Sequence, residues 1–166
     1  MKKLIITIVC LLSALFTVRA QEVIRIGIIG LDTSHSTAFT ELLNGTSDDP
    51  LAREFEVVAA YPYGSTTIPT SRDRIPGYIE TVRKFGVEIT SSIAELLDKV
   101  DCVLLETNDG RMHLEQAVEV FRSGKICYID KPLGATLGEA IAACDLRSAT
   151  VGDDALGRWR SAPAGK

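Results

Sequence analysis

The chain has 166 residues, enough for one domain of ordinary size. Hydrophobic residues make up 46% of it, which supports a packed core and argues against wholesale disorder. The formal net charge is −4, and no basic patch interrupts the acidic body, so we expect no nucleic acid as a partner.

The N-terminus has the pattern of a targeting segment. Lys2 and Lys3 precede an apolar run from Leu4 to Phe16, and Val18-Arg19-Ala20 resembles a signal-peptidase site. The run is shorter than the roughly 20 residues that span a bilayer. We therefore predict a cleaved signal peptide at residues 1–20, a periplasmic or secreted protein, and no stable membrane span after cleavage. An uncleaved anchor is the alternative.

Short apolar runs and helical periodicity alternate along the rest of the chain. The runs predict strands at Val23–Ile29, Glu56–Tyr61, Val87–Ile89, Cys102–Leu105 and Ile126–Ile129, with helices near Thr37–Leu43, Tyr78–Phe85, Ser92–Leu97, Leu114–Phe121 and Thr136–Arg147. This alternation is typical of a doubly wound α/β sheet, all parallel, in the order 3-2-1-4-5. We expect a single Rossmann-like domain over residues 22–149 and an irregular tail at 150–166.

Three local features complete the prediction. Ser34 or Ser36 is expected to cap the first helix, and Gly124 to follow the C-terminus of the fourth. The stretch Pro62–Pro76 contains three prolines and is expected to be a long surface loop. Cysteines in predicted strands, Cys102 and Cys127, are expected to be small buried hydrophobes rather than disulfide partners.

Polar residues gather just past the carboxyl ends of three strands. They are Asp32, Ser34 and His35 after the first strand, Thr107, Asn108, Asp109 and His113 after the fourth, and Asp130 and Lys131 after the fifth. These strands are neighbours in the predicted order, so the groups should converge into a small-molecule site at the switch point. The simpler interpretation is that His113 caps a helix and Asp32 closes a turn. The two histidines with Asp32 or Asp109 lack a metal-binding spacing, so we predict no metal site.

Four segments resemble the N-terminal half of the Gfo/Idh/MocA oxidoreductases. They are RIGIIG at residues 25–30, the helix after Ser92 leading into VDCVLLET, a histidine near the start of the next helix, and SGKICYIDKPLGATLGEA at residues 123–140. The last matches the family's Glu-Lys-Pro segment, with Asp130 in place of Glu. The resemblance implies a Rossmann domain that binds NAD or NADP and a following α/β domain that holds a sugar-like substrate.

The chain departs from the family's glycine fingerprint, G-x-G-x-x-G or G-x-G-x-x-A. Gly30 matches the first position, but Asp32 and His35 occupy the other two. The second glycine lets the backbone approach the pyrophosphate, where an aspartate brings bulk and negative charge. The acidic residue expected after the second strand is replaced by Tyr61-Pro62.

The resemblance assigns roles to residues at matching positions. Lys131 would be catalytic, with His113 nearby. The cofactor would be bound by Gly30, Leu31, Asp32, Thr107, Asn108, Asp130, Lys131 and Pro132. The reaction implied is hydride transfer between a nicotinamide and a sugar or polyol carbon.

Other possibilities stay open. Few residues follow the last helix, so we expect the chain as given to lack the substrate domain and full activity. It would then be truncated relative to the two-domain family, and a homo-oligomer is possible. The alternative function is an exported, non-catalytic module in which the cleft of Asp32, His35, His113 and Lys131 binds a small polar ligand.

Overall fold

A computed structural model describes residues 23–150, with side chains as far as residue 146. The predicted signal peptide and all of the predicted tail except Thr150 lie outside the described residues.

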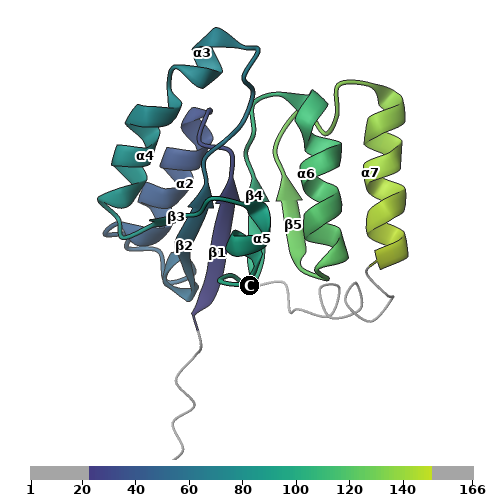
Figure 1. Ribbon diagram of the computed structural model, residues 1–166. Helices are drawn as coiled ribbons and strands as arrows, with labels where there is room; N and C mark the ends of the chain where they lie inside the picture. Colours follow the sequence, from purple (N-terminus) through teal and green to yellow (C-terminus); the bar gives the residue numbers. More distant parts are fainter. Residues whose placement is uncertain (1–22, 151–166) are drawn as a thin grey trace, which may run out of the picture.

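The described residues form five strands and six helices (Figure 1). The strands are β1 (Ile24–Ile29), β2 (Phe55–Tyr61), β3 (Glu88–Ile89), β4 (Cys102–Leu105) and β5 (Ile126–Ile129). The helices are α2 (Ser34–Asn44), α3 (Pro69–Arg72), α4 (Ile75–Arg83), α5 (Ile93–Leu97), α6 (Gly110–Arg122) and α7 (Leu137–Thr150), and a short 3₁₀ turn, η1 (Ala52–Glu54), precedes β2.

The strands form one parallel sheet in the order β3-β2-β1-β4-β5, which confirms the predicted topology. One core cluster joins β1 and β2 to α2 and α4, and includes Ile28 and Val82. The other joins β4 to α5 and α6, and includes Leu105 and Val120. The sheet therefore lies between two helical layers, as a doubly wound fold requires, while α7 packs beside α6 (Figure 1).

Central strand β1 ends at the switch point, because β2 pairs with one of its edges and β4 with the other. Its last four residues are buried, since helices cover both faces of the sheet. The carboxyl ends of all five strands point to the same edge, the upper one in Figure 1.

The prediction for Pro62–Pro76 was wrong in part. Helix α3 lies inside this stretch, and α4 begins at Ile75 instead of near Tyr78. Each helix carries a proline in its first turn, where a missing N–H costs no intrahelical hydrogen bond. The prolines that indicated a loop therefore begin two helices.

Helix boundaries also differ at the first helix. Thr33, not Ser34 or Ser36, is the N-cap of α2, and its hydroxyl accepts a hydrogen bond from the backbone N–H of His35. Ser92 is the N-cap of α5, which begins at Ile93 within the predicted helix Ser92–Leu97. Gly124 follows α6 with φ +75°, the left-handed conformation that the prediction required there.

The three cysteines of the described residues are thiols, but Cys102 and Cys127 are half-buried rather than buried, and Cys144 is exposed. Among residues 23–150, no helix is long and apolar enough to cross a membrane.

Candidate functional site

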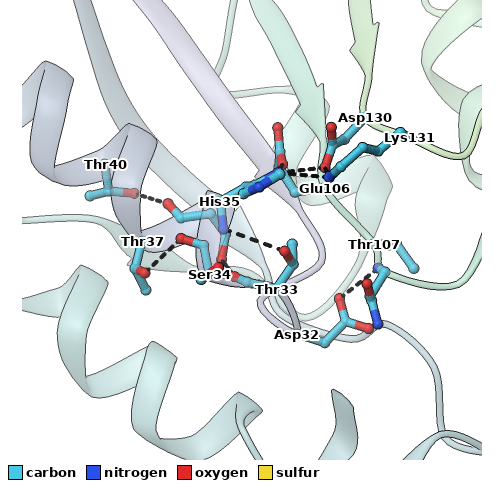
Figure 2. Close-up of polar contacts among 12 residues, drawn as sticks. Asp32, Thr33, Ser34, His35, Thr37, Thr40, Glu106, Thr107, Asp130 and Lys131 are labelled. Atoms are coloured by element: carbon cyan, nitrogen blue, oxygen red, sulfur yellow. Dashed lines mark hydrogen bonds and ion pairs between the residues drawn. The ribbon is translucent and has the colours of Figure 1, made fainter. Parts of the chain in front are cut away.

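The carboxyl edge of the sheet holds an unusual concentration of buried polar side chains. They come from the segments after β1, β4 and β5, and they are Asp32, Thr33, Glu106, Thr107, Asp109, His113 and Asp130. Figure 2 shows five of them: Asp32, Thr33, Glu106, Thr107 and Asp130. Buried polar groups need partners. The partners of these residues define how the edge is built.

Gly30 forms the turn between β1 and α2. Its φ is +92°, and a Cβ atom there would lie 2.6 Å from the backbone of Thr107. Its N–H donates to the Tyr61 carbonyl, and the N–H of fully buried Leu31 donates to the Pro62 carbonyl. Only glycine fits this close approach of β1 and β4, so the first fingerprint position keeps its structural role.

Asp32, at the second fingerprint position, is fully buried and faces inward. Its carboxylate accepts one hydrogen bond from the backbone N–H of Ser65 at 3.2 Å and one from that of Asn108 at 3.1 Å. Gly64 packs on the same carboxylate, because a Cβ atom there would lie 2.3 Å from Oδ2. Burial raises the pKa of Asp32 above its ordinary value, although these hydrogen bonds act to lower it. Asp32 therefore ties together the loops after β1, β2 and β4.

Asp109 anchors a second group of polar side chains. It is the N-cap of α6, and its carboxylate accepts hydrogen bonds from the Arg111 guanidinium at 2.6 and 2.8 Å and from the Ser65 hydroxyl at 2.7 Å. The Arg111 guanidinium holds the pKa of Asp109 well below its usual range. Asn108 also reaches the segment after β2, donating its side-chain amide to the Ser71 hydroxyl on α3. These contacts fix the loop after β2 over the switch point.

Three side chains from different strand ends meet in a third group. His35 Nδ1 lies 2.7 Å from Asp130 Oδ2 and 4.0 Å from Glu106 Oε2 (Figure 2). Lys131 Nζ lies 3.2 Å from the same Asp130 oxygen and 3.4 Å from His35 Nδ1. Burial raises the pKa of Asp130, but hydrogen bonds from the backbone and side chain of Lys131 and from His35 lower it overall. The predicted convergence of the residues after β1 and β5 is therefore present.

Glu106 is the member of this group that sequence reasoning missed. It is fully buried at the end of β4, and within the described residues neither carboxylate oxygen has a hydrogen-bond partner. Burial, with the nearby Asp130 carboxylate, raises the pKa of Glu106 to about 7, against the effects of His35 and Lys131. The available signal was a charged residue directly after an apolar strand, at the ligand-binding edge of a parallel sheet.

His113 lies beneath this surface. It is fully buried in the first turns of α6, and its Nε2 donates a hydrogen bond to the Thr107 carbonyl. Pro132 is exposed after a cis peptide bond and packs against the start of α6, where a Cβ atom on Gly110 would lie 2.8 Å from its ring. The structure thus pairs His113 with Thr107, and Lys131 with His35 and Asp130.

A parallel sheet in this order, with a glycine turn leading into a helix at its switch point, defines a Rossmann-type domain. Residues 24–150 match the family described as the oxidoreductase family with an NAD-binding Rossmann fold, Gfo/Idh/MocA. The chain belongs to this family, which confirms the resemblance. No curated protein matches the sequence.

Solved structures share the fold at low sequence identity. A dehydrogenase from Clostridium difficile is 24% identical, with a TM-score of 0.56, over 76% of this chain and 36% of that chain. A myo-inositol 2-dehydrogenase from Lactobacillus plantarum is 19% identical, with a TM-score of 0.58, over 78% and 34%. A 3-ketoreductase from Actinomadura kijaniata, solved with NADP, is 24% identical, with a TM-score of 0.56, over 78% and 36%. The chain spans about a third of the length of these proteins.

Proposed function

We propose that this chain is the exported NAD- or NADP-binding domain of an oxidoreductase that acts on a sugar or polyol. The observation that carries the proposal is the retained Gly30 turn between β1 and α2, with His35 of α2 in contact with Asp130 and Lys131 after β5. Family membership supports the cofactor class. None of the likenesses supports the alternative of a non-catalytic binding module.

The edge fits a dinucleotide in its main features. Helix α2 begins at the end of β1, so its N-terminus can receive a phosphate group, and Ser34 there is exposed. The objection raised by Asp32 is weakened, because its carboxylate is enclosed by two loops and not presented at this N-terminus. The cofactor would be held by the backbone of residues 30–32, by Thr107 and Asn108, and by the segment from Asp130 to Pro132.

The bound nicotinamide would supply the hydride chemistry, and the protein would orient it. Lys131 is suited to contact the substrate hydroxyl, because its side chain is 74% exposed while Asp130 holds its ammonium group at the sheet edge. An ammonium group donates hydrogen bonds, so it can polarise a hydroxyl or carbonyl oxygen.

His113 would contribute differently from Lys131. Its imidazole is fully buried and bound to the Thr107 carbonyl, so the placement supports a positioning role for the loop after β4 rather than direct contact with substrate.

The substrate class rests on relatives of greater length. One of them is a myo-inositol 2-dehydrogenase, and another solved relative is a UDP-N-acetylglucosamine 3-dehydrogenase from Acidithiobacillus ferrooxidans. A sugar or polyol is the substrate class that these share, and we carry it to this chain as part of the proposal.

Calorimetric titration of the purified protein with NADH and with NADPH tests the cofactor assignment. We expect micromolar binding of at least one, weakened by about tenfold in Lys131→Ala, the loss of one charged hydrogen bond. Lys84→Ala, which removes an exposed lysine at the end of α4, should bind as the wild type does. A folded wild-type protein that binds neither nucleotide would refute the assignment.

Export is tested separately by N-terminal sequencing of the protein recovered outside the cytoplasm. The mature chain should begin at Gln21. Protein that remains in the cytoplasm with residues 1–20 attached would contradict export.

A further inference from the structure

Glu106 presents a problem that the dinucleotide does not solve. Its carboxylate is fully buried, and among residues 23–150 neither oxygen receives a hydrogen bond. A buried carboxylate without a hydrogen-bond donor is unfavourable unless it is neutralised, paired or bound to a metal. This position therefore favours a positively charged ligand.

Two further donor atoms face the same space. One donor atom each from His35, Glu106 and Asp130 forms a set within 4.8 Å of one another, and the three residues come from the ends of β1, β4 and β5 (Figure 2). The strands fix the last two residues, and α2 fixes the first. The donor set is thus built by the sheet and not by one flexible loop.

His35 owes its place to a departure from the fingerprint. The third fingerprint position, where a small residue permits close packing of the helix on the strand, here carries an imidazole. That imidazole reaches Asp130 at 2.7 Å and packs edge-on against Phe39.

We propose that His35 Nδ1 and the carboxylates of Glu106 and Asp130 bind one divalent transition-metal cation, Mn²⁺ or Zn²⁺. One imidazole nitrogen with carboxylate oxygens is a donor set that both ions accept. Ligands about 2.1 Å from a tetrahedral ion lie about 3.4 Å apart. The separations of 2.7 Å and 4.0 Å from His35 Nδ1 bracket that value, so small side-chain shifts complete the set.

The site is open on one side. The His35 side chain is 41% exposed, which gives the ion a path and leaves a coordination position for water or a substrate oxygen. Lys131 now places its ammonium 3.2 Å from Asp130 Oδ2 and competes with a cation for that oxygen. Because most of the Lys131 side chain is exposed, it can move into solvent when the ion binds.

Titration of the purified protein with Mn²⁺, followed by loss of the free-ion EPR signal, tests the site. Mn²⁺ is the primary probe, because the thiols of Cys102, Cys127 and Cys144 would compete for Zn²⁺. Wild type should bind one ion. His35→Ala and Glu106→Gln should each weaken binding by about tenfold or more. Glu115→Gln, an exposed acid on α6, should leave the affinity unchanged.

Lys131→Ala separates this proposal from the dinucleotide assignment, because the two predict opposite effects. Removing the competing ammonium should tighten Mn²⁺ binding several-fold, whereas it should weaken NADH or NADPH binding. Equal Mn²⁺ affinity in wild type, His35→Ala and Glu106→Gln would overturn the metal site, as would no binding by a folded wild-type protein. His35→Ala changes a half-exposed side chain, so the test remains available if Glu106→Gln fails to fold. The nucleotide titration is independent of each result.

Discussion

Replacing Glu106 with Gln should remove a pH-dependent loss of stability. Burial and the neighbouring Asp130 raise the pKa of Glu106 from 4.5 to about 7, while His35 and Lys131 act in the opposite direction. The folded protein therefore retains a proton that the unfolded chain has already released. Between these two pKa values the native state binds more protons, so its stability falls as pH rises.

The size of the effect follows from the two pKa values. A tenfold change in an acid constant is about 1.4 kcal/mol, so the ionised Glu106 side chain costs the native state roughly 3 kcal/mol at high pH. About 2 kcal/mol of this falls between pH 5.5 and pH 8. As the pH rises across this range, the free energy of unfolding of Glu106→Gln should therefore increase by about 2 kcal/mol relative to that of wild type.

Urea denaturation at several pH values, with a chelator present, measures this difference. A constant cost of burying the Gln amide shifts all values equally and leaves the slope unchanged. Glu115→Gln controls for the removal of a carboxylate, because Glu115 is an exposed acid on α6. A difference between Glu106→Gln and wild type that does not change with pH would refute the reasoning.

Three further substitutions test the framework of the edge, each by urea denaturation. Gly30→Ala should destabilise the protein by more than about 1 kcal/mol, because φ is +92° and the new methyl group would meet the backbone of Thr107. The control, Gly77→Ala, adds a methyl group in open space on α4 and should be neutral or stabilising. Equal effects of the two substitutions would contradict the close approach at Gly30. Asp32→Ala should cost about 2–4 kcal/mol, since it leaves two backbone amides unpaired, and a cost below about 1 kcal/mol would argue against them. Asp101→Asn should cost less than about 1 kcal/mol, because its ion pair with Arg25 is roughly half exposed, and a larger loss would show a wider role.

The sheet order was predictable because its determinants are local and repeated. Each strand is a short apolar run bounded by polar or glycine residues, and helical periodicity between the runs requires right-handed crossovers between parallel strands. Gly124 and Ser92 mark helix ends through their own backbone or side-chain chemistry. Each of these signals is contained within a few residues of the element that it specifies.

Helix α3 at Pro69 and the true start of α4 near Pro76 were missed for a related reason. A proline breaks the interior of a helix, but it is common in the first turn of one. The sequence alone does not show which of these two cases applies. The packing of Val82 against β1 and β2 favours the helical arrangement, and that contact is not local.

The site was less predictable than the fold, because its properties depend on contacts between distant segments. Asp32 at a fingerprint position indicated repulsion of a phosphate, but amides from two other loops turn its carboxylate inward. In the sequence, Glu106 is simply the residue that follows the apolar strand β4. Its significance follows only from the burial of both carboxylate oxygens and the approach of His35 from another strand end.

The four buried acids of the edge differ in how their charges are balanced. Asp109 has the Arg111 guanidinium, Asp32 has two backbone amides, and Asp130 has Lys131 with His35. The fourth, Glu106, receives no hydrogen bond from the described residues, and His35 Nδ1 lies 4.0 Å from its Oε2. The charge of its carboxylate can be neutralised by a proton or by a cation, and the two compete for the same oxygens. The stability measurement therefore needs a chelator, because a bound ion would replace the proton and flatten the pH dependence that Glu106 otherwise produces.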